Sequence, residues 1–302
     1  RHGVRMNRDV SGHTYDVLVV GSTNLDLVAT VEHLPEPGET VLATSYAEHA
    51  GGKGLNQAVA SRRAGADTAF ITCLGTDAAG SGLHRLIVNE SIAAHVTDHD
   101  GPTGRALISV DGDAENSIVV VPGANAHLTL GAVESFRRVL ERARVILCQL
   151  EVPLEAVEAA LAIGKAGGAR TILNPAPARD LPPSLLSLCD VIVPNQHEIA
   201  MLGGTSALLD AGVGTIVVTL GARGIRVVTA EGDMEIPPYA VRALDTTGAG
   251  DAACGALAAS LALGDDITTA ARRASAAGAL AATRPGAVPS LPYREEIDAL
   301  VS

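Results

Sequence analysis

The chain has 302 residues, of which 47% are hydrophobic and 2% aromatic, and its formal net charge at pH 7 is −12. This length and apolar content are enough for one large α/β domain or two modest ones, with a core of Ala, Val, Leu and Ile. The acidic balance argues against nucleic acid or an anionic membrane as the main partner, although a nucleotide needs only local donors.

The cysteines lie far apart in the chain and form no C-x-x-C pair: Cys73, Cys148, Cys189 and Cys254. This pattern is typical of buried thiols in a reducing compartment, so we expect a cytoplasmic protein without disulfides. We expect no membrane partner, because no apolar run approaches the length of a span. The leader 1–15 is polar and lacks the apolar centre of a signal peptide, and we expect it to be disordered and outside the fold.

The first expected element is a buried parallel strand at 16–21, a short apolar run that ends in glycine. Asn24 and Asp26 follow it, at the end of the strand where open α/β sheets bind ligands. Their spacing lets both side chains face the same way. They are either ligand-binding residues or caps of a turn, and their spacing alone leaves both alternatives open.

Two segments break the α/β rhythm and predict a small separate β-sheet. The segment 28–46 contains two short β-like runs around P-E-P-G-E-T, and 103–121 is typical of a hairpin with an Asp-Gly turn. We expect a β lid formed by about 25–49 and 101–122.

A glycine-rich loop at 50–54 opens an Ala-rich helix. Lys53 adds a positive charge there, and Asn56 lies three residues further on, near the same helix face. The segment is either a ligand site or the start of a surface helix with a solvated lysine.

From residue 128 onward, four apolar strands are each followed by a polar or glycine-rich loop, at 144–148, 171–173, 191–193 and 215–220. This repetition predicts a doubly wound, mostly parallel central sheet flanked by helices, in a single domain over 16–302. Glu151 follows the first of these strands, either as a ligand-binding residue or as a helix cap. Glycines between Met201 and Thr215 predict a short helix there.

The most informative stretch is 244–251, a loop that becomes an Ala-rich helix. We expect Thr246 and Thr247 to cap this helix, and the glycines at 248 and 250 let backbone N–H groups point at one anion. A carboxylate at Asp251, in the first turn, fits a base that takes a proton from a hydroxyl attacking a phosphate. The alternative is an ordinary glycine loop before a buried helix.

Two motifs in particular resemble those of the ribokinase-like (PfkB) carbohydrate kinases. They are D-T-T-G-A-G-D at 245–251 and G-G-K-G-x-N-Q-A at 51–58. Further motifs follow the order of that family: G-S-x-N-x-D, P-G-E-T, N-P-A-P-A, P-N-x-x-E and T-L-G-x-x-G. The resemblance implies a parallel sheet between helices with a β lid, which agrees with the elements expected above.

The resemblance also implies an activity: ATP-dependent phosphorylation of a sugar, with ribose at its 5-hydroxyl as the expected substrate. A kinase for deoxyribose, fructose or adenosine is an alternative, and so is a sugar-binding protein without catalysis. Asp251 would be the base, and the amides of Gly248, Ala249 and Gly250 would form the anion hole. Because the lid leaves one face and its edges without a core, we expect a homodimer through it.

Three sets of ligand-binding residues follow from the same resemblance. The sugar would be held, together with Asp251, by Asn24, Asp26, Gly51, Gly52, Lys53, Asn56 and Glu151. ATP would contact Asn195, Thr219, Leu220, Gly221, Ala222, Arg223, Gly224, Gly250 and Ser275. Glu198 would order the water shell of Mg²⁺, and backbone oxygens would bind K⁺ at Asp245, Thr247, Ala281, Arg284, Gly286 and Ser290. The chain departs from the family at Ala252 and Ala253, where Ser or Thr and then Phe are usual.

Overall fold

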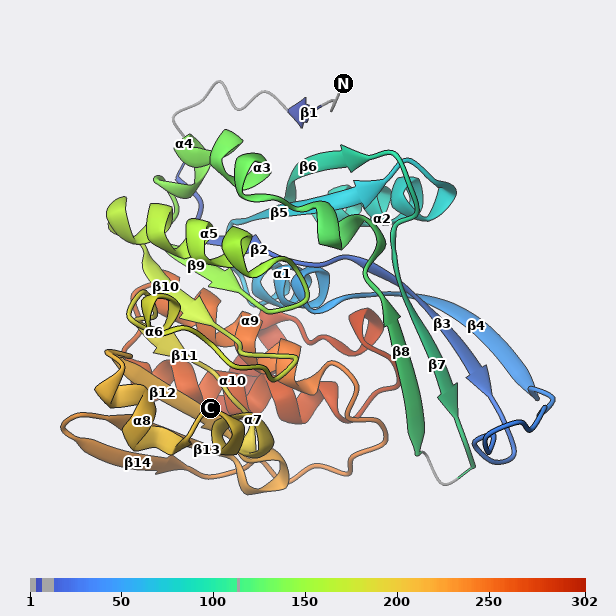
Figure 1. Cartoon of the computed structure of the whole chain (residues 1–302). Helices are drawn as coiled ribbons and strands as arrows, with labels where there is room; N and C mark the ends of the chain where they lie inside the picture. Colours follow the sequence, from blue (N-terminus) through green and yellow to red (C-terminus); the bar gives the residue numbers. More distant parts are fainter. Residues whose placement is uncertain (1–3, 7–13, 113–114) are drawn as a thin grey trace.

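The computed structural model of the protein describes residues 4–6, 14–112 and 115–302. Within these residues the main sheet has ten strands, and the seven central ones, from β6 to β12, run parallel (Figure 1). In spatial order they are β1 (Val4–Met6), β6 (Ala93–His99), β5 (Thr68–Gly75), β2 (Val17–Val20), β9 (Val145–Cys148), β10 (Arg170–Leu173), β11 (Val191–Ile192), β12 (Thr215–Thr219), β13 (Ile225–Thr229) and β14 (Gly232–Ile236).

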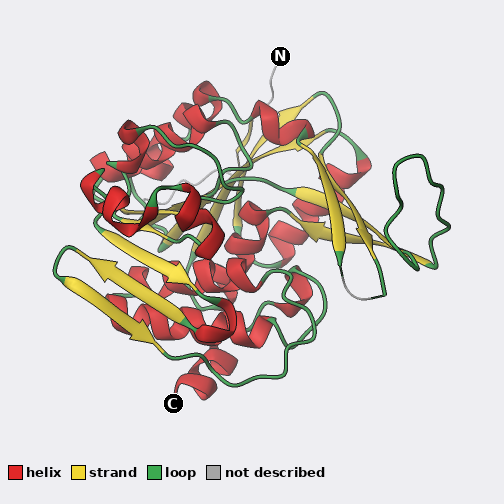
Figure 2. Cartoon of the chain, turned by 60° about the horizontal axis from the view of Figure 1, so that its bottom comes forward, coloured by secondary structure: helices red, strands yellow, loops and turns green. Residues whose placement is uncertain are grey.

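Helices cover both faces of this sheet (Figure 2). Side chains alternate along a strand, so Val17 and Val19 of β2 pack into one core while Leu18 and Val20 pack into the other. The first core is covered by α1 (Lys53–Arg63), α2 (Ala78–Asn89), α9 (Ala249–Ala262), α10 (Ile267–Ala281) and α11 (Arg294–Val301). The second is covered by α3 (Leu130–Ser135), α4 (Arg137–Leu140), α5 (Leu154–Ala166), α6 (Pro183–Leu186), α7 (Gln196–Met201) and α8 (Gly204–Asp210).

The chain order reverses between β2 and β9. From β2 the chain continues to β5 and β6 on one side, whereas β9 to β12 extend on the other side of β2. Ligands of open α/β sheets bind in the crevice at such a reversal, outside the carboxyl ends of the strands. The fold therefore places the loops after β2 and β9 at the position where a site is expected.

The lid is a separate sheet in the order β4-β3-β7-β8, and it projects from the main body at the right of Figure 1. It contains β3 (Asn24–Thr30), β4 (Ser45–Gly51), β7 (Gly104–Val110) and β8 (Asn116–Val121). β7 and β8 pair antiparallel, and β3 and β7 pair parallel. The expected α/β fold with a small β lid is confirmed.

Two local expectations were wrong. Part of the leader joins the fold, because Val4–Met6 pairs antiparallel with β6, whereas residues 1–3 and 7–13 lie outside the described part. The helix α9 begins at Ala249 after an N-cap at Gly248, whose φ of 76° lies in the left-handed region. Thr246 and Thr247 therefore precede the cap, since the turn needs a residue that adopts positive φ without strain.

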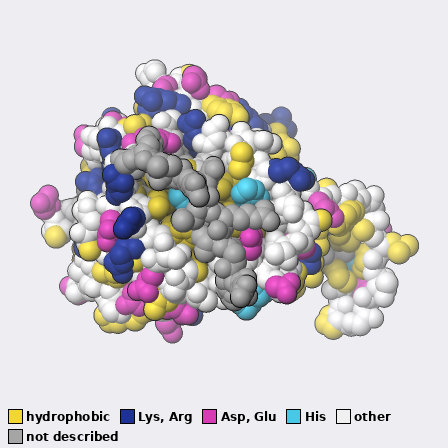
Figure 3. Space-filling view, turned by 90° about the horizontal axis from the view of Figure 1, so that it is seen from above, with side chains coloured by type: hydrophobic (Ala, Val, Ile, Leu, Met, Phe, Trp, Pro, Cys, Tyr) yellow, Lys and Arg dark blue, Asp and Glu magenta, His cyan; other side chains and the backbone are white. Residues whose placement is uncertain are grey.

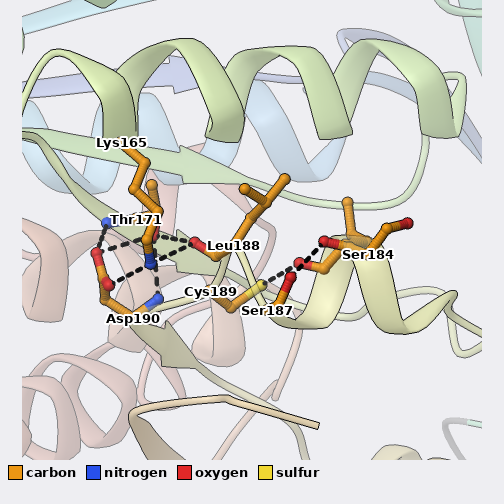
Figure 4. Close-up of polar contacts among 8 residues, drawn as sticks. Lys165, Thr171, Ser184, Ser187, Leu188, Cys189 and Asp190 are labelled. Atoms are coloured by element: carbon orange, nitrogen blue, oxygen red, sulfur yellow. Dashed lines mark hydrogen bonds and ion pairs between the residues drawn. The ribbon is translucent and has the colours of Figure 1, made fainter.

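Polar contacts tie the end of α5 to β10 and β11 (Figure 4). Thr171 is fully buried, and its hydroxyl donates to the Leu188 carbonyl at 2.5 Å. Asp190 accepts from the Thr171 backbone N–H at 2.9 Å and from Lys165 Nζ at 2.7 Å. These contacts belong to the opposite end of β10 from the loop at Asn174.

In the described part of the chain, none of the helices has both the length and the apolar character required to cross a membrane.

Candidate active site

The loops after β2 and β9 are joined directly at the reversal of strand order. Ser22 Oγ donates to Glu151 Oε2 at 2.6 Å, and the Lys53 backbone N–H donates to the same oxygen at 3.0 Å. Glu151 thus holds the β2 loop and the first residue of α1 together. Its side chain links these two elements and does not cap the helix that follows Pro153, which has no side-chain cap. The ligand-binding alternative stays a prediction.

Asp251 lies in the first turn of α9, and two amide side chains of α1 hold it. Asn56 Nδ2 donates to Asp251 Oδ2 at 2.9 Å, and Gln57 Nε2 donates to Asp251 Oδ1 at 2.8 Å. The two helices approach closely because Gly255 faces α1, where an added Cβ would lie 2.4 Å from the Ala60 Cβ. Without a side chain at 255, α1 can deliver both donors to one carboxylate.

The same small-residue packing continues on the other side of α9, against α10. Ala252 and Ala253 are buried in this region, and a Cβ on Gly278 would lie 3.7 Å from the Ala253 Cβ. Both alanines that depart from the family pattern are therefore buried, and Ala253 lies in van der Waals range of the α10 surface at Gly278.

Four charged side chains interact at this site: Asp26, Lys53, Glu151 and Asp251. Burial, and after it the negative charges of Glu151 and Asp251, raises the pKa of Asp26 to about 7. Burial lowers the pKa of Lys53, but the carboxylates of Asp251 and Glu151 outweigh it and raise that pKa overall. Burial also raises the pKa of Asp251, although Lys53 and the two amide donors oppose the change. Lys53 is therefore a cation beside two carboxyl groups, Asp26 and Asp251, whose pKa values burial raises.

A cavity of about 210 Å³ opens beside Asp251. Seven of its lining residues were expected from the sequence: Lys53, Asn195, Glu198, Thr219, Gly248, Gly250 and Asp251. Four others were not assigned a role from the sequence: Asn174, Ala176, Val193 and Cys254. The last, Thr246, was expected only as a helix cap. The N-P-A-P-A motif was the available signal for Asn174 and Ala176, because it follows β10 at the same edge of the sheet.

The start of α9 provides the expected anion site with one difference. A Cβ added at Gly250 would meet no other atom within 4 Å, so the space in front of this residue is free. The Ala249 amide is already used, since it donates to the Thr246 carbonyl at 3.2 Å. The amides of Gly248 and Gly250 remain as donors beside the positive end of the α9 dipole.

Two of the residues expected to contact ATP, Asn195 and Thr219, line the cavity next to Glu198. Asn195 caps α7, its Oδ1 accepting from the Glu198 N–H at 2.8 Å, and Glu198 Oε2 accepts the Asn195 N–H at 2.8 Å. Asn195 also bridges to Thr219 at the end of β12. The remaining expected ATP contacts do not line the cavity: Leu220, Gly221, Ala222, Arg223, Gly224 and Ser275. Five of them form the η2 turn (Gly221–Arg223) and its flanks, whereas Ser275 is buried on α10.

The two loops expected to share a cation are in contact. Asp245 Oδ1 accepts from the Thr247 N–H at 2.9 Å, and Asp245 Oδ2 accepts from the Gly286 N–H at 2.8 Å. Burial raises the pKa of Asp245, but hydrogen bonds from Thr247 and Gly286 lower it more. The 245–248 turn and the 284–290 loop therefore form one unit. Within this loop Ser290 is fully buried, and Arg284 forms an ion pair with Glu296. Ala281, the remaining residue expected to bind the cation, is the last residue of α10, just before the loop.

The sugar residues expected from β3 and β4 lie next to one another. Asn24 pairs with Gly51 across the two strands, and a Cβ at Gly51 would lie 2.0 Å from Asp26 Oδ2. Gly51 thus leaves room for the Asp26 carboxylate. Asn24 Oδ1 accepts from Asn125 Nδ2 at 2.7 Å, so a residue of the η1 turn (Gly123–His127) that was not assigned from the sequence orients Asn24. Gly52, with φ of 89°, caps α1.

A second cavity of about 250 Å³ lies near the ends of β5 and β6 and contains none of the expected site residues. Thr76, His84, Arg85 and Asp98 contribute its polar lining. The Asp251 carboxylate, Lys53 and the start of α9 line the other cavity, which is therefore the candidate active site.

Comparison with known proteins identifies the family of the chain. Residues 14–294 match the family model described as pfkB family carbohydrate kinase. A bifunctional ribokinase/ribose-5-phosphate isomerase A of Fructilactobacillus sanfranciscensis is 41% identical over 297 residues, covering 93% of the chain and 55% of that protein, so the chain spans about half of it. A ribokinase of Haemophilus influenzae is 39% identical over 292 residues, covering 92% of the chain and 95% of the relative. The structure of Arabidopsis thaliana ribokinase complexed with ribose and ATP matches with a TM-score of 0.85 at 28% identity, covering 96% of the chain and 99% of that protein.

Proposed function

The chain belongs to the pfkB family of carbohydrate kinases, and from this premise we propose that it uses ATP to phosphorylate D-ribose at the 5-hydroxyl. The observation that carries the proposal is the Asp251 carboxylate, which is buried between amide donors and Lys53 at the edge of a cavity. The names of the relatives, ribokinases at 39% and 41% identity, support ribose as the substrate.

Asp251 accepts the proton of the attacking hydroxyl. Burial raises the pKa of this carboxyl, which makes the carboxylate a better base, while Asn56 and Gln57 keep it oriented. The base is fixed before the substrate arrives, so little reorganisation is needed during the reaction.

The start of α9 binds the transferring phosphoryl group. The amides of Gly248 and Gly250 lie at the positive end of a fourteen-residue helix, and the missing side chain of Gly250 leaves space for phosphate oxygens. Lys53 adds a positive charge at the same cavity.

Glu198 fits the role of ordering the water shell of Mg²⁺. Its Oε2 is held by the Asn195 N–H, and the side chain lines the cavity, so the other oxygen is available for a bound water. Mg²⁺ in such a site shields the charge of the ATP phosphates. The same proposal extends to K⁺ at the loops around Asp245 and Gly286, because the hydrogen bond between these residues holds the two loops together next to the start of α9.

The sugar lies between the lid and α1, against Asp26, Lys53 and Asn56. Asn56 Oδ1 is buried and accepts no hydrogen bond from the described residues, although its Nδ2 is engaged by Asp251. An unpaired buried acceptor is costly unless a ligand supplies the donor. A sugar hydroxyl next to the base provides that donor.

The substrate is tested by a coupled ADP-release assay with ribose, deoxyribose, fructose and adenosine. A site built to bind hydroxyl groups can reject an analogue that lacks one by about 10⁴- to 10⁵-fold, so we expect ribose to have the highest kcat/KM. A higher kcat/KM for fructose or adenosine would contradict the proposal, and ATP consumption with none of the four would favour a sugar-binding protein without catalysis.

A homodimer through the lid is the second part of the proposal. On the lid face opposite Asp26, large apolar side chains are exposed: Tyr46 at 61%, Leu107 at 46%, Val119 at 58% and Val121 at 41%. Figure 3 shows hydrophobic side chains gathered on this projecting sheet. An exposed apolar face of this kind is typical of an interface. The four buried, unpaired cysteines support a cytoplasmic location.

A further inference from the structure

Three buried amide side chains from different parts of the chain form a continuous hydrogen-bonded series that ends at Asp251. Gln149 Nε2 donates to Gln57 Oε1 at 2.6 Å. Gln57 Nε2 then donates both to Asn174 Oδ1 at 3.0 Å and to Asp251 Oδ1 at 2.8 Å. Gln57 and Gln149 are fully buried, and Asn174 is 8% exposed.

The series permits only one orientation of the Gln57 amide. Asn174 Nδ2 donates to the Val193 carbonyl at 2.9 Å, so Asn174 must turn its oxygen toward Gln57. At the other end, Gln149 presents its NH₂ group to Gln57 Oε1. If the Gln57 amide were reversed, its oxygen would face both the Asn174 oxygen and the Asp251 carboxylate, and its NH₂ group would face a donor.

The position of Gln149 lowers the stability of the fold. Its Oε1 is buried and accepts no hydrogen bond from the described residues. The space for this side chain exists only because residue 21 is glycine, since a Cβ there would lie 2.1 Å from Gln149 Oε1. A buried acceptor without a partner is destabilising, so the contact of Gln149 with Gln57 comes at a cost to the stability of the fold.

We propose that Gln149, Gln57 and Asn174 form an amide relay that positions the Asp251 carboxylate for proton acceptance. The relay connects the base to the ends of β9, β10 and β11. Gln149 and Asn174 hold Gln57, and Gln57 in turn fixes Asp251 Oδ1, which Gln149 and Asn174 do not contact themselves. The inference rests on the proposed function, because it takes Asp251 as the base. All three are positioning residues, and Gln149 acts only through Gln57.

The charged and titratable groups around Asp251 are unchanged by variants of the relay. Lys53 faces it from α1, Glu198 from α7, Cys254 from its own helix, Glu151 from the loop after β9 and Asp26 from the lid. A change in kcat or in its pH profile that follows the loss of an uncharged amide therefore cannot come from a change in the number of charged groups around Asp251.

The test uses Gln57→Met and Gln149→Met, which preserve side-chain length and approximate volume while removing the amide. A hydrogen bond to a charged group corresponds to about a 10- to 100-fold effect, so we expect Gln57→Met to lower kcat about tenfold or more. KM for ribose and for ATP should stay within about twofold of wild type. The acid limb of the kcat–pH profile should move upward by about one pH unit, because the carboxylate loses a donor.

Gln149→Met is expected to lower kcat less, by about three- to tenfold, as one neutral hydrogen bond predicts. The double variant should have the kcat of Gln57→Met alone, since Gln149 acts only through Gln57. Thr171→Val is the matched control: Thr171 is equally buried and hydrogen-bonded on β10 but has no link to Asp251, and its kcat should stay within about twofold of wild type (Figure 4). Thermal unfolding of each variant verifies the fold.

Three outcomes would overturn the relay. One is a folded Gln57→Met enzyme with more than half of the wild-type kcat and an unchanged pH profile. The second is a double variant whose losses multiply, and the third is a Thr171→Val enzyme that loses kcat as much as the relay variants. If Gln57→Met does not fold, an unchanged kcat and pH profile in Gln149→Met overturns the proposal by itself. A wild-type protein that releases no ADP with ribose overturns the proposed function and the relay together, whereas the three outcomes above leave the proposed function standing.

Discussion

Replacing Asp26 by asparagine should stabilise the protein at high pH while weakening its sugar site. Burial, with the charges of Glu151 and Asp251 added, raises the pKa of Asp26 from 3.8 to about 7. Below pH 3.8 the carboxyl is protonated in both the folded and the unfolded chain, and its full contribution to stability is present. Between pH 3.8 and 7 the unfolded chain releases the proton while the folded chain keeps it, so stability is lost as pH rises.

The size of this loss follows from the two pKa values. Each pH unit between them corresponds to about 1.4 kcal/mol, so the penalty is about 1 kcal/mol at pH 4.5 and about 4 kcal/mol at pH 8. Asp26→Asn removes the ionisation. Because asparagine also needs hydrogen-bond partners in this site, we expect a gain in the free energy of unfolding of about 2 to 4 kcal/mol at pH 8 and about 1 kcal/mol or less at pH 4.5.

Urea denaturation at pH 4.5 and pH 8 measures the difference, with protein concentration held constant because a dimer's stability depends on it. Glu231→Gln is the control: Glu231 is exposed in the turn between β13 and β14, away from the lid, and its replacement should change stability by less than about 0.5 kcal/mol at either pH. A gain in Asp26→Asn that does not depend on pH would refute the reasoning, because it would mean that the carboxyl ionises in the folded protein at no cost.

Three further predictions concern the anion site, the cation loops and the lid. Gly250→Ala should fold with equal or slightly higher stability but lose at least about tenfold in kcat/KM, because its methyl group would occupy the free space beside the phosphate. An unchanged kcat/KM in a steady-state assay would count against the anion site. Turnover should be higher in potassium than in sodium or tetramethylammonium buffers, since the cation braces the loops joined by Asp245 and Gly286, and equal turnover in all three would remove the potassium proposal. Val119→Asp should convert a dimer into a monomer in light scattering, whereas Val88→Asp, which introduces the same charge at a 51%-exposed position on α2, should not; a wild-type monomer with full activity at micromolar concentration would contradict the lid interface.

The sequence was sufficient to predict the layers of the fold because the signals for them are local. The apolar runs at 16–21 and 144–148 predicted strands that are buried on both faces, and the structure places their carboxyl ends at the reversal of strand order. The excursions at 28–46 and 103–121 predicted the lid for the same reason, since each strand was recognisable without its partner.

Two local features were predicted incorrectly because propensity was outweighed by geometry. Thr246 and Thr247 are good capping residues, but the turn before α9 needs a left-handed conformation and therefore places the cap at Gly248. The segment Val4–Met6 shows no apolar centre, yet it pairs with the edge strand β6 through its backbone, and such pairing leaves no pattern in the residue types.

The candidate site was predicted as a set of residues but not as a structure. Asp251, Asn56 and Lys53 belong to recognisable motifs, and the fold brings them together. The contacts of Gln57 with Gln149 and Asn174 join residues 92 and 117 positions apart. Gln57 and Asn174 belong to motifs, but neither motif predicts these contacts, and Gln149 belongs to none. Only the three-dimensional structure shows that they form one series with the Asp251 carboxylate.

Asp251→Asn tests the central claim most directly, in one experiment that measures kcat with ribose and ATP together with ribose affinity by calorimetry. Asparagine preserves the shape of the side chain but cannot accept the proton, and general-base assistance is worth about 10²- to 10⁴-fold in rate. The account predicts that kcat falls by at least about a hundredfold while the Kd for ribose changes by less than about fivefold, since binding depends on the other sugar contacts. A folded Asp251→Asn protein that retains more than about a tenth of the wild-type kcat would contradict the assignment of Asp251 as the base.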